Sequence, residues 1–276
     1  MRTLVGLFCR CLCACIAWCA LAAEPAPVAS WKKYETPVGG SDHILLNNGA
    51  TVQLNTDTGL RTLVVGSDIT VAVDRGEAFF RVGSSPLRVV VDDVSVSGTG
   101  TSFSVRDYGG GDVDIMALDG LVHIDSVRTR QATAMLLSNR VARVVSPGQM
   151  ATVRKGRVSL QDPGRARIER KLMWRYGMLE LLDDRIADAA AEFNRYGSVT
   201  LVVEDPSIGR RRIGGRFSVS AVAAFVATAS RIFPMRIATS KSAAGAVIHL
   251  QRGPEVSAAN SATGDRNTLA TLHGAR

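Results

Sequence analysis

The sequence predicts a mainly β protein in which an all-β domain, built as a sandwich, barrel or short β-solenoid, is followed by a small α+β module. Between Ser41 and Leu160 apolar residues alternate with polar ones, which is the period of half-buried strands. Clusters of turn residues interrupt this alternation at short intervals, as in all-β folds. Beyond residue 172 apolar residues recur at helical spacing instead. The chain of 276 residues has room for two domains, which is the division that we favour.

We expect the all-β domain over residues 34–160. Its strands show as alternating apolar residues, and its turns as glycine-rich or Asn/Asp-Gly steps. The glycines at 109–111 fit a hairpin turn rather than a phosphate-binding loop, because neither a helix start nor a P-loop lysine follows. The alternating pairs include Ile69 and Val71, Val94 and Val96, Phe103 and Val105, and Val122 and Ile124.

We expect the α+β module over residues 172–251, with the order β-α-β-β-α-β-β. The polar, basic residues 161–171 suit a linker or a short surface helix. A strand is expected from Trp174 to Leu182, then a helix capped by Asp183, and later a second helix capped by Ser220. The helices show in Ile186, Ala189, Ala190 and Phe193, then in Val222, Phe225, Val226 and Ala229; the other strands are expected at 199–203, 213–219, 235–238 and 246–250. Residues 252–276 are expected to form a disordered tail.

The first 23 residues have the layout of an export signal. Arg2 and Arg10 flank the start of the apolar run 11–23, which ends in small residues before Glu24. Cleavage would give a soluble periplasmic protein, whereas an uncleaved signal-anchor over residues 4–23 would hold the protein in the inner membrane. A lipoprotein site at residues 12–15 is a weaker reading. Both leading options place the remainder outside the cytoplasm.

The charge of the exported part favours anionic neighbours. The leader holds two of the 33 basic residues and none of the 25 acidic ones, which leaves a formal charge of +6. In the envelope such a surplus would attract lipid headgroups or an acidic partner domain, and it raises association rates more than it specifies a partner. Nucleic acid is not expected as a partner there.

Reactive side chains are scarce beyond the leader. All five cysteines lie at or before Cys19, so the remainder has no thiol for a disulfide, a metal or a nucleophile. His123 and His249 lie within expected strands, as solvent-face or cross-strand residues, and no histidine shows a recognised ligand spacing. We expect neither an enzyme nor a cofactor nor a bound metal. The acidic pairs Asp92-Asp93, Asp112 with Asp114, and Asp183-Asp184 stand at turns or helix starts, where aspartate makes local hydrogen bonds.

Two phrases in the all-β domain, residues 75–82 (Arg-Gly-Glu-Ala-Phe-Phe-Arg-Val) and 100–106 (Gly-Thr-Ser-Phe-Ser-Val-Arg), resemble the signature strands of the FecR family of envelope regulators. Residues 45–57 resemble its opening hairpin and residues 146–149 its later turn. Trp174, Gly177, Leu179 and residues 187–196 look like its C-terminal module, so that the match covers roughly residues 34–250. The element order of the second module also resembles the secretin and TonB short N-terminal module.

This resemblance implies a regulator that docks on the signalling domain of a TonB-dependent outer-membrane receptor and so controls an extracytoplasmic-function sigma factor. Many members hold the sigma factor with a cytoplasmic N-terminal domain, and here only Met1 to Arg10 precede the apolar run. A sigma factor is therefore expected as a partner only if a cytoplasmic segment exists. The alternative is a secreted periplasmic scaffold or binding protein with no transcriptional role. A hydrolase would need a side-chain cluster that the sequence does not announce.

Two segments are candidates for binding a partner. The run Arg210, Arg211 and Arg212 lies in an expected loop and could steer an acidic partner, although such runs are more often solvated. The strand Ala246, Val247, Ile248, His249 and Leu250 is expected to be an exposed edge that accepts a strand from another protein. The FecR signature residues are expected to be structural, with Phe79 and Phe80 on opposite faces of one strand; they are Gly76, Glu77, Phe79, Phe80, Gly100, Thr101 and Phe103.

Overall fold

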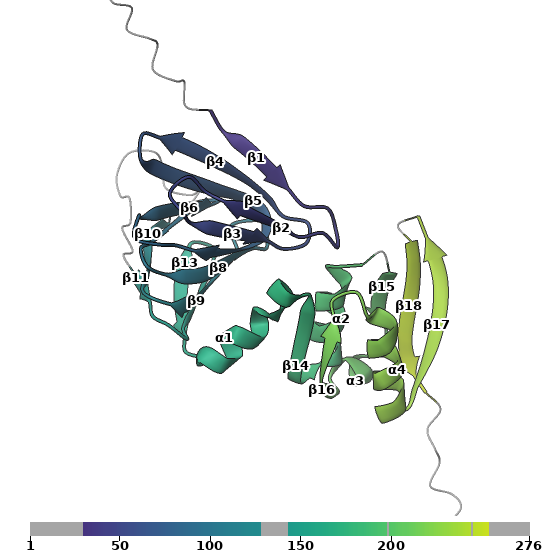
Figure 1. Ribbon diagram of the computed structural model, residues 1–276. Coiled ribbons are helices and arrows are strands. Elements are labelled where there is room, and N and C mark those ends of the chain that lie inside the picture. The colour runs from purple at the N-terminus through teal and green to yellow at the C-terminus, as the bar shows by residue number, and fades with distance from the viewer. Residues whose placement is uncertain (1–29, 128–142, 198, 244, 254–276) are drawn as a thin grey trace, which may run out of the picture.

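The computed structural model describes residues 30–127, 143–197, 199–243 and 245–253. They form a β region of residues 32–161 and an α+β region of residues 165–252, with helix α1 between the two bodies (Figure 1). The β region comprises β1 (Lys32–Glu35), β2 (Asp42–Leu45), β3 (Thr51–Leu54), β4 (Gly59–Val65), β5 (Asp68–Arg81), β6 (Leu87–Val91), β7 (Val94–Gly98), β8 (Ser102–Asp107), β9 (Val113–Asp119), β10 (Val122–Val127), β11 (Arg143–Val145), β12 (Met150–Arg154) and β13 (Arg157–Gln161).

Within the described residues these strands form one sheet that curls into a nearly closed barrel (Figure 1). Its main path runs β11-β10-β7-β6-β5-β8-β9-β12-β13, and the β1–β4 and β2–β3 pairs branch from β5. All pairs are antiparallel except β5 with β6. The predicted mainly β fold is thus confirmed, and the barrel is the observed form.

Strand β5 changes its inward face at Gly76. Ile69, Val71 and Val73 point into the core before this residue, whereas Ala78 and Phe80 do so after it. The change follows from a register shift against β4, because one extra residue in a strand exchanges its two faces. Beyond the shift β5 leaves β4 and pairs with β3 and β8. The predicted opposite orientation of Phe79 and Phe80 is confirmed: Phe80 stacks on Phe103 in the barrel core, and Phe79 faces the α+β region.

The α+β region packs two helices against two small sheets. The antiparallel pair β14–β16 forms one sheet, and the order β15-β18-β17 forms the other. The predicted inward residues of both helices are buried, which confirms the helical periodicity. The elements are α1 (Arg165–Lys171), the 3₁₀ helix η1 (Met173–Tyr176), β14 (Met178–Arg185), α2 (Ile186–Asn194), β15 (Val199–Val203), α3 (Pro206–Gly209), β16 (Arg212–Ser218), α4 (Val222–Ile232), β17 (Met235–Ser242) and β18 (Gly245–Arg252).

Several local predictions in this region are wrong. Trp174 lies in η1 rather than at the start of a strand, because Gly177 takes a left-handed conformation and β14 begins only after it. Asp183 does not cap α2; it lies in the irregular part of β14, and the cap residue is Arg185 without a side-chain hydrogen bond. Ser220 does not cap α4, whose cap residue is Ala221.

Of the two readings of residues 161–171, a linker and a short helix, the structure shows helix α1, with Ile168 fully buried. Arg252 belongs to β18 rather than to the predicted tail, and the part of that tail after Gly253 lies outside the described residues. Within the described ranges, no helix is long and apolar enough to span a membrane. The predicted leader lies outside the described residues.

Candidate functional site at the contact between the two regions

The carboxylate of Glu77 joins the two regions. Its side chain is 2% exposed and accepts hydrogen bonds from Trp174 Nε1 at 2.9 Å and from Asn55 Nδ2 at 3.0 Å. Arg195 Nη2 lies 2.9 Å from Glu77 Oε2 and provides a positive charge that is itself mostly buried. Trp174 belongs to η1 and Arg195 follows α2, so that one residue of β5 holds two elements of the α+β region. A buried carboxylate is tolerated because donors and an opposite charge satisfy it together.

The backbone at Gly76 sets the position of Glu77. Gly76 has φ +88°, and a Cβ atom added there would lie 2.5 Å from Thr58 Oγ1. That hydroxyl instead accepts a hydrogen bond from the Glu77 N–H at 3.0 Å. Both the left-handed conformation and the close approach require glycine at this position. The Gly-Glu step therefore aims the carboxylate at the α+β region.

A second ion cluster extends the contact. Glu192 of α2 pairs with Arg195 and, across the junction, with Arg106 of β8 at 3.1 Å. Burial alone would raise the pKa of Glu192, but the guanidinium groups of Arg195 and Arg106 outweigh it and lower that pKa. Burial opposes the charge of Arg195 as well, yet Glu77 and Glu192 raise its pKa above the ordinary value. Glu192 and Arg195 are therefore both charged at neutral pH.

The loop after β3 contacts the end of α2. Thr56 Oγ1 donates to the Arg195 carbonyl at 2.9 Å, and Asn55 Nδ2 lies 3.0 Å from the Tyr196 hydroxyl. Burial is the main reason that the pKa of Tyr196 is raised, so this hydroxyl remains protonated. These bonds attach a β-region loop directly to the α2 terminus.

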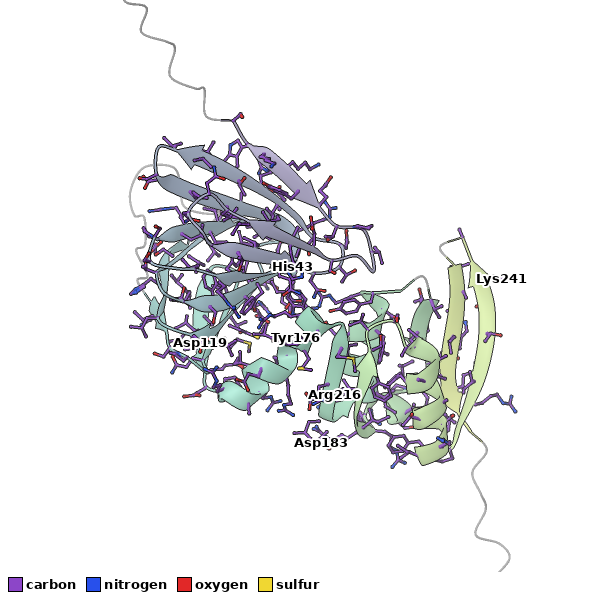
Figure 2. The ribbon with its side chains drawn as sticks, in the orientation of Figure 1. His43, Asp119, Tyr176, Asp183, Arg216 and Lys241 are labelled. Atoms are coloured by element: carbon purple, nitrogen blue, oxygen red, sulfur yellow. The ribbon has the colours of Figure 1, made fainter. Side chains whose placement is uncertain are left out.

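Helix α1 and η1 make a further set of contacts with the barrel surface. Gln53 Nε2 donates to the Arg175 carbonyl at 2.8 Å, and the Arg175 guanidinium lies 3.7 Å from the centroid of the Phe79 ring. Burial is the main cause that lowers the pKa of Arg175. At the other end of α1, Arg165 Nη1 lies 2.8 Å from Asp119 Oδ1 (Asp119 and Tyr176 are labelled in Figure 2). The junction is thus a continuous mixed polar and apolar contact.

A cleft of about 210 Å³ opens beside this junction. The β8–β9 surface, α1, β14 and the first turns of α2 line it. Glu77, Arg106 and Glu192 of the junction line it as well. The cleft and the flanking ion cluster together form the best-defined candidate binding site of the described residues.

The predicted arginine run does not act as one patch. Arg210 follows the short helix α3, is exposed, and has no ion-pair partner among the described residues. Arg211 lies 5.9 Å from the centroid of the Phe233 ring, and Arg212 Nη1 donates to the Asp183 carbonyl at 2.6 Å. Only Arg210 therefore fits the predicted role of a free charge. Its binding role remains a prediction.

The prediction that residues 246–250 form an exposed edge strand is wrong. Residues Ala246 to Leu250 belong to β18, which is the central strand between β15 and β17 and therefore has no free edge. Leu250 is fully buried in the apolar core of the region. The mistake arises because strand order does not follow chain order: the last strand inserts between two earlier ones. Strand β17 forms the exposed edge of this sheet instead (Figure 1).

Most of the signature residues have structural positions, and two of them reach the junction. Phe80 and Phe103 fill the barrel core, and Gly100 has φ +61° in the turn before β8, next to a register shift in the β8–β9 pair. Glu77 and Phe79 are the exceptions, because the Glu77 carboxylate belongs to the junction and the Phe79 ring contacts the Arg175 guanidinium. Sequence reasoning missed Asn55, Trp174 and Arg195 as partners of Glu77, because they lie far from it in the chain and share no spacing that would reveal the cluster.

The outer face of the β15–β18–β17 sheet carries a serine–histidine–glutamate chain. His249 Nε2 lies 2.8 Å from Ser240 Oγ, and His249 Nδ1 lies 2.7 Å from Glu204 Oε1. This order of groups occurs in hydrolases, where a substrate pocket and oxyanion donors accompany it. None of the three residues lines the cleft. These two bonds join His249 of β18 to Ser240 of β17 and to Glu204, which follows β15. This agrees with the prediction that His249 is a cross-strand residue.

The acidic pairs make contacts within the fold, some of them to residues far away in the chain. Asp114 Oδ1 lies 2.9 Å from Arg154 Nη2, and Asp112 lies near the same guanidinium at 3.7 Å. Asp92 Oδ2 accepts a hydrogen bond from the Gly111 N–H, and Asp184 Oδ2 one from the Leu182 N–H. Among the described residues, no three histidine, cysteine or acidic side chains lie together as a metal site would require.

Comparison with known proteins finds a family model that matches part of the chain and solved structures that share its fold. Residues 32–123 match the family model described as FecR protein. Two crystal structures of a proposed anti-sigma factor from Parabacteroides distasonis, at 1.65 and 2.50 Å resolution, share the fold with TM-scores of 0.63 and 0.61. Each is 18% identical to this chain, and the alignments cover 81% and 82% of this chain and 100% of the other. No curated protein matches the sequence.

The chain contains a FecR family domain, as its two signature phrases predict. FecR proteins are non-enzymatic regulators, which agrees with the prediction that this chain is not an enzyme. The structural likeness spans both regions and extends the shared fold well beyond residue 123.

Proposed function

We propose that this protein is a FecR-like envelope regulator of the anti-sigma type. In this proposal the α+β region lies outside the cytoplasm and docks on the signalling domain of a TonB-dependent outer-membrane receptor. Docking would change how an extracytoplasmic-function sigma factor is held, where a cytoplasmic segment exists to hold it. The supporting observation is the FecR domain joined to an α+β region in one fold that a proposed anti-sigma factor shares over its whole length.

The α+β region offers two features for docking. Arg210 is exposed and has no ion-pair partner among the described residues, so it is free to meet an acidic surface. The exposed strand β17 leaves one edge of its sheet unpaired in the described structure, and such edges accept strands from partner proteins. Both features lie outside the junction with the β region, which leaves the junction intact on docking.

A pull-down from native membranes tests this proposal. The full chain with its own N-terminus and a C-terminal tag would be compared with Arg210→Glu. Arg88→Glu is the matched control, because Arg88 is an exposed arginine on β6 in the other region. We expect a TonB-dependent receptor to be recovered with the unaltered chain and with the control, and to be depleted with Arg210→Glu. Arg211 and Arg212 are poor choices, since both make contacts within the fold.

The opposite result has a clear meaning. Recovery of cell-wall or transport components without any receptor would overturn receptor docking and leave a periplasmic scaffold with no transcriptional role. Equal recovery of the receptor with all three chains would retain docking but exclude Arg210 from the interface.

A further inference from the structure

The edge of β14 that faces away from β16 has no strand partner in the described structure. The Val219 N–H donates to the Gly177 carbonyl at 2.9 Å, which fixes the hydrogen-bonded positions of the antiparallel β14–β16 pair. Because such positions alternate, the main-chain groups of Met178 and Glu180 point away from β16. The next amide on that side, Leu182 N–H, is already bonded to Asp184 Oδ2. The available edge is therefore a short one.

This edge opens into the cleft beside the junction. Four successive residues of β14, from Leu179 to Leu182, line the cleft. Successive side chains of a strand point to opposite faces, so a surface that touches all four must lie along the strand edge. The volume of about 210 Å³ suits a short extended segment better than a folded domain.

Helix α1 lines the cleft with positive charges that have no ion-pair partner among the described residues. Arg167, Arg170 and Lys171 line the cleft at i, i+3 and i+4 of α1, so they share one helix face. No carboxylate lies within ion-pair distance of any of the three among the described residues. Their neighbour Arg165, by contrast, is paired with both Asp119 and Glu169.

Most of the carboxylates that line the cleft already have an ion-pair partner. Asp114 is paired with Arg154, Glu180 with Arg216, and Glu192 with Arg106 and Arg195. Asp188, in the first turn of α2, and Asp184 of β14 are the acids of the lining without an ion-pair partner among the described residues, although Asp184 accepts a hydrogen bond from the Leu182 N–H. The three cations of α1 outnumber these two acids, and the positive charge that they place along α1 favours an acidic occupant.

We propose that this cleft binds a short, extended, acidic segment of a partner protein. The segment adds a third strand to the β14–β16 sheet through the main-chain groups of Met178 and Glu180, and its carboxylates meet Arg167, Arg170 and Lys171. Main-chain pairing provides affinity without regard to sequence, and the cations select the charge. This proposal concerns a different edge from β17 and does not depend on the identity of the receptor.

A binding experiment with a defined probe tests this inference. The probe is a short fluorescein-labelled peptide of alternating glutamate and valine, and fluorescence anisotropy measures its binding to the chain. We expect the triple variant Arg167→Ala, Arg170→Ala, Lys171→Ala to bind it roughly tenfold more weakly, as the loss of three exposed ion pairs predicts. The matched control Arg88→Ala, Arg157→Ala, Lys241→Ala removes the same charge from exposed sites; Lys241 lies on the far side of the α+β region (Figure 2). It should bind within about twofold of the unaltered chain, since screening limits distant charges.

Two further readouts separate strand pairing from simple charge attraction. A peptide of the same sequence with alternate amides N-methylated cannot pair as a strand, and it should bind roughly tenfold more weakly. Hydrogen exchange should slow at Met178 and Glu180 when the unmethylated peptide is bound, with no change in β17.

Each contrary outcome overturns the inference. Failure of the unaltered chain to bind the acidic peptide, equal binding by the triple variant and its control, or equal binding of the N-methylated peptide would each do so. Recovery of a receptor in the pull-down together with no peptide binding would overturn this inference alone and leave the proposed function standing.

Discussion

The two regions differ in how each completes its core. The apolar core of the β region is formed by its own strands, from Ile44 to Val153. The apolar core of the α+β region includes Phe79 of β5 and Met116 of β9, both contributed by the barrel surface. We infer that the β region folds as a self-sufficient unit, whereas the α+β region depends on the surface against which it packs.

This difference explains how neighbouring residues of β5 serve different cores. Phe80 points into the barrel and Phe79 into the α+β region, because successive side chains of a strand face opposite ways. Separating the regions would expose Phe79 and break the buried contacts of Glu77 at the same time. A partner that docks on the α+β region therefore meets a body anchored to the barrel.

Truncation of the two phenylalanines provides the strongest test of this comparison. Phe80→Ala should lower the free energy of unfolding by about 3–5 kcal/mol, because it leaves a cavity in the barrel core. Phe79→Ala should lower it by less, since one face of the Phe79 ring contacts the Arg175 guanidinium rather than an apolar core. Chemical denaturation would measure both, and limited proteolysis would show which region opens first. We expect cleavage within residues 165–252 for Phe79→Ala.

Equal losses, with both regions opening together, would contradict the asymmetry. The chain would then behave as one cooperative unit, in which neither core is more self-sufficient than the other.

Removal of the buried carboxylate tests the junction itself. Glu77→Ala leaves the Arg195 charge largely buried with one partner fewer, and breaking such a pair costs about 3–5 kcal/mol. Glu180→Ala is the matched control, because its partner Arg216 is exposed and such pairs contribute about 0–1 kcal/mol. Hydrogen exchange at the end of α2 should accelerate in Glu77→Ala and stay unchanged in the control. An equally small effect of both variants would show that apolar packing alone holds the regions together.

Periodicity predicted the elements well and their order in space poorly. Alternation from Ile69 to Ile124 marked barrel strands correctly, because each strand has one face in a single core. The position of β18 in the middle of its sheet could not be predicted from its own residues. It depends on the pairing of strands that are far apart in the chain, and the spacing within one strand carries no information about its neighbours.

The junction was less predictable than either core. Glu77 stood within a recognisable phrase, but nothing near it in the sequence indicated Trp174 or Arg195 as partners. The free cations of α1 were visible only as part of a polar segment. The binding role proposed for these cations depends on which basic side chains have a carboxylate nearby. Those neighbours are determined by the folded structure and cannot be inferred from the sequence of α1.

The smallest of the expected effects is a weakening of the junction in acid, which we expect from the ion cluster around Glu192. Its neighbours Arg195 and Arg106 hold the pKa of Glu192 below its ordinary value despite burial. A lowered pKa in the folded state contributes stability at pH values above the ordinary glutamate pKa, about 4.3, and this contribution is lost as the pH falls through the folded-state pKa. As the pH is lowered from about 7 to about 3, the free energy of unfolding of Glu192→Gln should therefore fall less than that of the unaltered chain.

Glu169→Gln is the matched control for this measurement, since Glu169 pairs with Arg165 at the surface of α1, where both side chains are about half exposed. It should retain the acid dependence of the unaltered chain, because a solvated pair differs little between the folded and unfolded states. Identical slopes for Glu192→Gln and the unaltered chain would show that Glu192 carries no share of the acid sensitivity. The dependence of the α+β region on the barrel would then rest on Glu77 and Phe79.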